Sequence, residues 1–533
     1  MNDNVITAAR DTYAAMGDSI ILGAPVHEGV CHPEPLIRIP LGMMNRHGLI
    51  AGATGTGKTK TLQLLAEQLS NAGVPVFVSD IKGDLSGLGA AGESNDRIAQ
   101  RAKDTGHDWH GSSFPVEFLS LTGKNGAQVR ATVSSFGPLL LAKVLGLNDT
   151  QKSVLALVFK YCDDHGLALL DFSDLRAVLQ YLSDEGAKEL KEYGGMSKAT
   201  VGVLLREMVE LEQQGAGDFF GEPEFDLDDL MQVERDGRGL ISVLSLNDVQ
   251  DRPAVFSTFM LWMLARLFHE LPEVGDVAKP KLVFFFDEAH LLFDDASRDL
   301  LDEIEKVARL IRSKGVGIFF VTQSPKDVPA EVLGQLGHRV QHALRAFTED
   351  DEKALRAAAR TYPKTEFYDI QATLTSLGTG EALVTVLSPK GVPTPPFATR
   401  LIAPASRMSP LTAEEYAQRI ASSQQVKEYA TPVDRESARE ILAKRVEASV
   451  EASNAAEPAG TGAGGGTGEA AGTANAGTAA RGTGGRKRAP KEPPSALETI
   501  AKSPLTRTVA GVITRGLMGA LLGTPPRRRR SIF

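Results

Sequence analysis

Eight consecutive residues near the start of the chain have the types and spacing of a loop that holds a polyphosphate. Residues 52–59 read Gly-Ala-Thr-Gly-Thr-Gly-Lys-Thr and fit the pattern G-x-x-x-x-G-K-[ST]. Glycines let the backbone wrap closely around phosphate groups, and the N-terminus of a following helix supplies oriented N–H groups. Lys58 would neutralise charge on the β- and γ-phosphates, and the Thr59 hydroxyl would ligate Mg²⁺. A glycine-rich turn that only caps a helix is the plainer alternative. We predict that ATP binds to Gly52, Ala53, Thr54, Gly55, Thr56, Gly57, Lys58, Thr59 and Lys60.

An acid pair follows a predicted strand farther along the chain. Residues 281–286 are almost wholly apolar, and Asp287 and Glu288 come directly after them. A nucleoside triphosphate with Mg²⁺ needs a second carboxylate at the end of a neighbouring strand. We predict that Asp287 holds the Mg²⁺ shell and that Glu288 orients or deprotonates the attacking water. The pair could instead be an ordinary helix N-cap.

Two further polar segments follow predicted strands. Gln323 comes after the apolar residues 316–322, where its side chain could touch both the γ-phosphate and the attacking water. Residues 80–84, Asp-Ile-Lys-Gly-Asp, end another strand, and ligands bind at the carboxyl ends of parallel strands. An acid of this segment could assist the metal or the water. The segment could equally form a plain turn.

These residues need a parallel sheet to bring them together. Residues 48–52 and 74–78 read as strands around a helix over 58–72, which makes a β-loop-α-β unit. Helical spacing dominates between 138 and 232 and predicts an all-α insertion. Near-continuous apolar strands separated by helices then return, as in a parallel sheet covered on both faces. The predicted fold class is therefore α/β, with a mainly parallel sheet flanked by helices.

Changes in composition along the chain set the predicted boundaries. Residues 459–484 are almost all Ala, Gly or Thr, and such a stretch cannot offset its ordering entropy, so we predict a disordered linker. The predicted segments are a short β-rich segment at 1–47, the first part of the core at 48–137, the α-helical insertion at 138–232, the second part of the core at 233–405, C-terminal helices at 406–455, the linker at 456–494, and an amphipathic helix with an Arg-rich tail at 495–533.

Charge is unevenly distributed over the 533 residues. The chain carries a formal net charge of −9, but residues 481–533 hold twelve basic and two acidic residues, so the rest is strongly acidic. An acidic body does not favour general nucleic-acid binding, because phosphate contacts need Lys and Arg. Two cysteines, Cys31 and Cys162, exclude a disulfide framework and fit a reducing cytoplasm. We find no signal peptide and no transmembrane segment, and we expect a cytoplasmic protein.

The motifs, taken in order, resemble the HerA–FtsK superfamily of P-loop motor ATPases, and most of all the bacterial HerA-like proteins of the YjgR group, usually labelled helicase-like. The resemblance rests on 52–59, 80–84, Asp287-Glu288 and Thr322-Gln323, with the helical insertion between the second and third. Residues 78–85 and 335–345 also resemble sequences of this group. It covers about residues 15–405 and the tail from about 495.

The resemblance implies a RecA-like ATPase core that works as a ring of identical subunits, usually a hexamer, and translocates on double-stranded DNA. Each active site would be completed by an arginine from the neighbouring subunit. Arg339 and Arg345 are the candidates for this finger or for a related sensor, although Arg309, Arg312 and Lys314 could equally serve. The chain shows neither the N-terminal barrel of archaeal HerA nor the winged-helix reader of FtsK, so DNA as the track comes from the resemblance alone.

Other functional classes compete with this interpretation. Residues 287–290 spell the DEAH box of a two-lobed helicase, but the Q-R-x-G-R-x-G-R type motif of a second lobe is missing. A small-molecule P-loop kinase needs neither the acid pair nor the terminal Gln. The serious alternative is an ATP-driven protein or secretion motor, or a nucleotide-dependent scaffold, which suits the acidic body. A nuclease or a secretion component would be its protein partner.

The basic tail allows three interpretations. It could contact nucleic acid, because blocks of like charge often bind polyanions. It could lie on a membrane surface, because apolar residues of 505–521 recur at helical spacing beside Arg507 and Arg515. It could instead dock on a neighbouring subunit and end in a solvated stretch, which is the interpretation we prefer.

Overall fold

The strand that leads into the glycine-rich loop lies inside a large mixed sheet in the computed structural model of the protein. The structure describes residues 2–14, 16–293 and 298–456, so the linker and tail predicted beyond 456 lie outside the described residues. The strands are β1 (Ser19–His27), β2 (Val30–Cys31), β3 (Ile37–Pro40), β4 (Gly48–Ala51), β5 (Val76–Asp80), β6 (Val116–Ser120), β7 (Ala127–Gln128), β8 (Ile241–Ser245), β9 (Leu282–Phe286), β10 (Val316–Thr322), β11 (His338–His342), β12 (Glu381–Thr385) and β13 (Phe397–Leu401).

The strand order is β2-β1-β13-β12-β11-β4-β10-β9-β5-β8-β6-β7, with β3 paired to β1 off this path. From β11 to β7 all pairs are parallel, whereas β12, β13 and β1 to β3 pair antiparallel. The register pairs Thr322 with Ala51 and Phe320 with Phe286, so the segments that follow β4, β9 and β10 leave the sheet at one edge. The predicted α/β fold class is confirmed.

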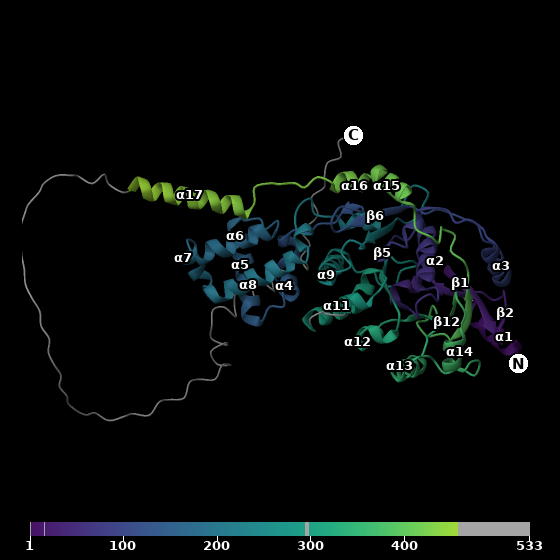
Figure 1. Ribbon diagram of the computed structural model, residues 1–533. Coiled ribbons are helices and arrows are strands. Elements are labelled where there is room, and N and C mark those ends of the chain that lie inside the picture. Colours follow the sequence, from purple (N-terminus) through teal and green to yellow (C-terminus); the bar gives the residue numbers. More distant parts are fainter. Residues whose placement is uncertain (1, 15, 294–297, 457–533) are drawn as a thin grey trace, which may run out of the picture. The chain divides into compact units, whose positions relative to one another are not determined.

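Helices cover the sheet and form the insertion (Figure 1). They are α1 (Asn2–Tyr13), α2 (Lys58–Asn71), α3 (Asp96–Thr105), α4 (Val133–Val144), α5 (Asp149–His165), α6 (Phe172–Ser183), α7 (Ala187–Leu190), α8 (Lys198–Gln213), α9 (Pro253–Glu270), α10 (His290–Phe293), α11 (Arg298–Leu310), α12 (Ala330–Leu333), α13 (Glu349–Arg360), α14 (Ile370–Ser376), α15 (Ala413–Ser422), α16 (Gln424–Tyr429) and α17 (Ala438–Ala456). Short 3₁₀ turns are η1 (Leu41–Arg46), η2 (Ser86–Gly89), η3 (Lys191–Tyr193), η4 (Ala216–Asp218), η5 (Leu227–Met231), η6 (Ile311–Lys314) and η7 (Pro325–Asp327).

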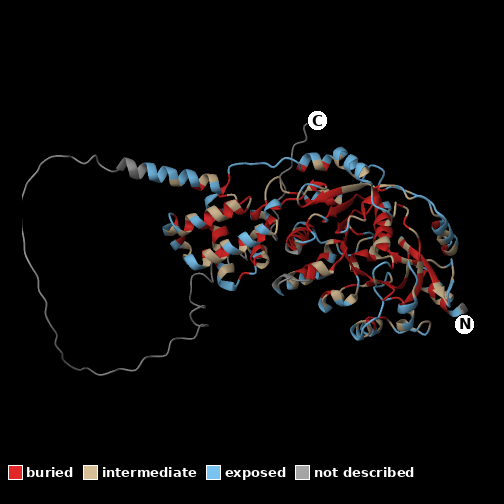
Figure 2. Ribbon diagram, viewed as in Figure 1, coloured by how far each residue is buried: buried red, intermediate tan, exposed pale blue. Residues whose placement is uncertain are grey.

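The central strands are apolar on both faces because both faces are covered. Side chains alternate along a strand, so Phe284 and Phe286 of β9 pack with α9 on one face, while Phe285 packs with Leu62 and Leu65 of α2 on the other. Figure 2 shows this buried layer running through the sheet. The continuous apolar pattern of residues 281–286 thus reflects burial from two sides.

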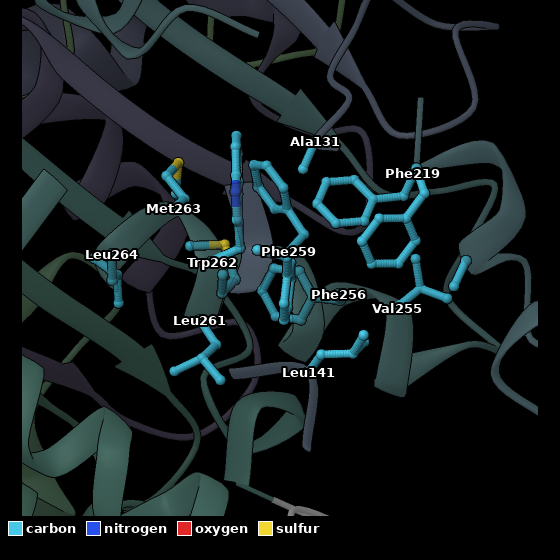
Figure 3. Packing of buried hydrophobic residues seen from close by; sticks show 14 of the residues in the cluster. Ala131, Leu141, Phe219, Val255, Phe256, Phe259, Leu261, Trp262, Met263 and Leu264 are labelled. Carbon is cyan, nitrogen blue, oxygen red and sulfur yellow. The ribbon is translucent and has the colours of Figure 1, made fainter. Parts of the chain in front are cut away.

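The insertion is helical and is attached to the core by aromatic packing. No strand occurs between 133 and 232, where α4 to α8 lie. The ring of Phe219 meets Phe259 and Trp262 of α9 edge-on, at centroid distances of 5.8 and 5.7 Å (Figure 3). Such edge-to-face pairs add to the stabilisation from burial. The insertion therefore shares a core with the helix that covers the sheet.

Residues 404–437, which we call the strap, connect α2 to the insertion. Glu67 of α2 accepts hydrogen bonds from the backbone N–H of Ala405 and Ser406, at 2.7 and 2.9 Å. Tyr416 then donates to the carbonyl of Asn125 near β7. At the far end, Ser437 hydrogen-bonds Asp174 of α6. The segment 406–455, for which C-terminal helices are predicted, contains α15, α16 and α17.

Candidate active site

The glycine-rich loop between β4 and α2 takes a conformation that depends on glycine. Gly52, Gly55 and Gly57 have φ angles of +153°, +78° and +113°. A Cβ on Gly52 would lie 2.5 Å from Cβ of His342, whereas a Cβ on Gly55 would meet nothing within 4 Å. The loop is therefore pressed against the sheet on one side and open on the other, as an anion-binding loop requires.

Lys58 opens helix α2 and turns back over this loop. Its Nζ donates to the carbonyl oxygens of Gly52, at 2.8 Å, and of Ala53, at 3.3 Å. Burial lowers the pKa of Lys58, and the negative charges of Glu288 and Asp287 oppose this shift. The structure thus brings the loop lysine and both predicted acids within electrostatic range of one another.

A second layer of contacts holds the loop from behind. The buried His342 at the end of β11 lies 2.8 Å from the Thr61 hydroxyl through its Nε2. The backbone N–H of Gly380 donates to the carbonyl of Thr56 at 2.9 Å. Because these partners belong to β11 and the start of β12, the loop's shape depends on strands that are distant in sequence.

Asp287 directly follows β9, and its carboxyl group is buried. Its backbone N–H donates to the Ser79 hydroxyl of the neighbouring strand at 3.1 Å. Burial, reinforced by the charge of Glu288, raises the pKa of Asp287 to about 7. A carboxyl group that is costly to ionise alone is well suited to a bound cation, which favours the ionised form.

Glu288, the next residue, has an uncommon backbone conformation, and both of its carboxylate oxygens contact other side chains. Its φ of +49° lies in the left-handed region, which is rare for a residue with a side chain. Oε1 pairs with the ammonium group of Lys82, and Oε2 accepts from Nε2 of Gln323 at 3.0 Å. Burial acts to raise the pKa of Glu288, but Lys82 and Gln323 outweigh it and the pKa is lowered. Glu288 is therefore ionised and held from two neighbouring strands.

The segment after β5 is shaped by Asp80. The Asp80 carboxylate accepts backbone N–H groups of Gly83, Asp84 and Leu85 at 2.8, 3.2 and 3.0 Å. The interpretation as a turn thus accounts for Asp80. Asp84 is half-buried beside it.

Other predicted residues divide between the site and its surroundings. Thr59 lies half-buried in the first turn of α2, and Gln323 reaches Glu288 as described. The Lys60 side chain instead binds the carbonyl of Met408 in the strap and Gln63 of its own helix. Lys60 therefore offers the site only its backbone N–H.

Among the described residues, no ion pair joins a candidate arginine to the acid pair. Arg339 is half-buried in β11 opposite Leu49, near the start of that strand, and Arg345 is exposed in the segment after it. Arg309, Arg312 and Lys314 come before β10 and therefore lie at the amino edge of the sheet. Among the described residues, none of the five forms an ion pair, and Lys314 lies over the ring of Phe268. Their roles stay predictions.

The sequence analysis did not identify two residues that contribute to the site, Lys82 and His342. Lys82 was visible only as part of the motif 80–84, and its pairing with Glu288 depends on β5 and β9 being neighbours. His342 was one residue of the stretch 335–345 that carries the resemblance, and nothing in its sequence surroundings signals that it supports the glycine loop.

A sequence model of the helicase HerA-like C-terminal family matches residues 29–530 of the chain. The chain belongs to this family. Among curated members of such families, a probable helicase of Methanocaldococcus jannaschii, MJECL08, is 30% identical over 154 residues, 27% of this chain and 28% of that relative. The DNA double-strand break repair helicase HerA of Sulfolobus acidocaldarius is 20% identical over 369 residues, 65% of this chain and 64% of that relative. This family member therefore spans less than two thirds of either relative.

Solved structures similar to this HerA-like chain include two proteins at 15% identity. The bacterial conjugative coupling protein TrwB has a TM-score of 0.48, with 76% of this chain and 93% of that chain covered. VirB4 of Thermoanaerobacter pseudethanolicus has a TM-score of 0.46, with 75% and 98% covered. Among the described residues of this family member, no helix is long and apolar enough to cross a membrane.

Proposed function

We propose that the protein is a Mg²⁺-dependent ATPase that works in the cytoplasm as a ring of six copies. In this proposal the ring is a motor that moves on double-stranded DNA. The observation that carries the ATPase proposal is the gathering of Lys58, Asp287 and Glu288 at one edge of the sheet. A glycine loop with open space at Gly55 faces the same edge. The family and the names of its relatives support the DNA motor, and two free cysteines support the cytoplasm.

The residues present fit Mg²⁺ and a triphosphate. The Thr59 hydroxyl and the Asp287 carboxylate are the oxygen ligands that Mg²⁺ prefers, and Mg²⁺ would neutralise charge on the phosphates when bound. Lys58 exchanges the loop carbonyls for phosphate oxygens. Glu288 takes a proton from water as the water oxygen bonds to the γ-phosphorus and the bond to the ADP oxygen breaks. Gln323, which touches Glu288, aligns that water.

Two substitutions test this proposal. Lys58→Ala should weaken ATP binding roughly 10- to 100-fold, because a charged hydrogen bond is lost. Glu288→Gln should retain ATP binding but lower turnover at least about 100-fold, because the base is lost. Binding is measured by equilibrium titration and turnover by phosphate release.

The matched controls change the same charges elsewhere. Lys326 and Glu331 are exposed, so Lys326→Ala and Glu331→Gln should bind and hydrolyse ATP like the wild type. Wild-type turnover in Glu288→Gln would show that Glu288 is not the base. Unchanged ATP binding in Lys58→Ala would remove the glycine loop from the proposal.

An ATP-driven protein motor remains the second candidate, because the strongly acidic body of the chain is a poor general surface for DNA. The two-lobed helicase is disfavoured, because the described residues contain one sheet and that alternative requires a second lobe. The two remaining candidates share the same active site and differ only in the track.

A further inference from the structure

Three protein side chains contact the carboxylate of Glu288. Lys82 pairs with Oε1, Gln323 donates to Oε2 at 3.0 Å, and Nδ1 of His290 lies 3.4 Å from Oε2. Only 7% of the Glu288 side chain is exposed. A general base needs an oxygen directed at the water it deprotonates. In this arrangement Glu288 is therefore held away from that task.

Lys82 is the partner best able to leave. Its backbone segment is fixed by the three hydrogen bonds to Asp80, but half of its side chain is exposed. A lysine side chain has a flexible four-carbon stem, so its ammonium group can move while the backbone segment stays in place. The positive charge of Lys82 also acts on Lys58, so both ammonium groups lie near the same edge of the site.

We propose that Lys82, the ion-pair partner of Glu288, is a second phosphate-binding lysine. When ATP enters, Lys82 transfers from the Glu288 carboxylate to the γ-phosphate, which offers more negative charge and more acceptor oxygens. The transfer leaves Oε1 of Glu288 free to face water. This inference rests on the proposed ATPase function and adds a role for a residue outside the glycine loop and the acid pair.

The proposal makes a thermodynamic demand on the pair. Lys82 can bind ATP only after its ion pair with Glu288 has broken. Glu288 and ATP therefore compete for Lys82. Removing the charge of Glu288 should then tighten ATP binding, and most of that gain should need Lys82. A double-mutant cycle measures this coupling, and it requires no turnover.

The cycle uses full-length wild type, Lys82→Met, Glu288→Gln and the double variant, titrated with a non-hydrolysable ATP analogue and Mg²⁺. We expect Lys82→Met to bind about tenfold more weakly and Glu288→Gln about tenfold more tightly than the wild type. In the Lys82→Met background, the effect of Glu288→Gln should shrink to about twofold. An equal effect of Glu288→Gln in both backgrounds overturns the proposal.

Further titrations test whether the effect of Lys82 depends on the γ-phosphate and on positive charge. ADP lacks the γ-phosphate, so Lys82→Met should change ADP affinity by less than about twofold, and a tenfold loss for ADP overturns the γ-phosphate contact. Lys82→Arg keeps the charge and should retain most of the affinity and coupling. Lys326→Met removes an exposed positive charge that follows β10 and should leave the cycle unchanged.

The same set of variants shows whether a loss of binding comes from unfolding or from a lost contact. Thermal melts of each variant show whether it is folded, and Lys82→Gln, which also removes the charge, supplies the cycle if Lys82→Met does not fold. A folded wild type that binds no analogue overturns the proposed function together with this inference. Analogue binding without coupling overturns the role of Lys82 alone.

Discussion

Glu67 is a buried carboxyl group on α2 whose two oxygens accept backbone hydrogen bonds from the strap. Burial raises the pKa of Glu67 to about 7, although the bonds from Ser406 and Ala405 work against the rise. A carboxyl group with a raised pKa binds its proton more tightly in the folded state than in the unfolded state. Its contribution to stability is therefore complete below about pH 4.5 and is lost as the pH rises to about 7.

Glu67→Gln removes this titration. Relative to the variant, the wild type should lose roughly 3 kcal/mol of unfolding free energy between pH 5 and pH 8, since one pKa unit corresponds to about 1.4 kcal/mol. The measurement is the difference between the two thermal midpoints across that range. Parallel midpoints at all pH values would show that Glu67 has an ordinary pKa.

At this scale the sequence predicted the residues that carry a motif and missed their partners. Lys58 and the pair Asp287-Glu288 were identifiable because their residue types and order are constrained by phosphate chemistry. Lys82 and His342 were not, because each acts through a contact with a strand far away in sequence. Lys60 was included for its position in the loop, but its side chain is engaged by the strap.

At the scale of elements, the strap ends at Ser437, whose hydrogen bonds to α6 and α17 can be tested. Ser437 is bonded to Asp174 of α6 and to Glu440 in the first turn of α17. Ser437→Ala should cost about 1 kcal/mol, because the hydrogen bonds that the hydroxyl donates to Asp174 and Glu440 are lost together. That cost corresponds to roughly fivefold more frequent opening of α17.

Limited trypsin digestion measures this opening, since Arg439, Lys444 and Arg445 lie in α17. We expect cleavage there to become roughly fivefold faster in Ser437→Ala, whereas Ser449→Ala, on an exposed part of the same helix, should be cut at the wild-type rate. Equal cleavage in Ser437→Ala would mean that the buried Ala438 and Leu442 hold α17 without the hydrogen bonds of the Ser437 hydroxyl.

Elements with strong periodicity were predictable, and those that depend on tertiary contacts were not. Strand β10 begins and ends where its apolar residues do. Strand β11 ends at His342, because the backbone of Ala343 and Leu344 bonds instead to the glycine loop and α14. Helix α1, in a segment predicted to be β-rich, was missed. The boundaries between segments stay predictions.

At the scale of the whole molecule, one assay distinguishes a motor that moves on DNA from a motor that moves protein. If the motor acts on DNA, duplex DNA should raise the ATPase rate several-fold at low salt. The stimulation should fall as salt rises, because phosphate contacts release counterions. The assay is phosphate release with and without duplex DNA, and light scattering of the same sample should give the mass of six chains.

Heparin is the control for charge alone, because it is a polyanion without a double helix. A DNA motor should respond to duplex DNA more than to heparin at equal charge. An ATPase rate that duplex DNA leaves unchanged at every salt concentration would contradict the DNA motor and support the protein motor.

The sheet order has a consequence for how the polypeptide is made. Strand β4 lies between β10 and β11, so both of its hydrogen-bonding neighbours are encoded more than half-way along the chain. During translation the glycine loop leaves the ribosome long before either neighbour exists. The nascent chain must therefore carry an apolar, unpaired strand through synthesis of the entire helical insertion, and a prematurely terminated product would expose it.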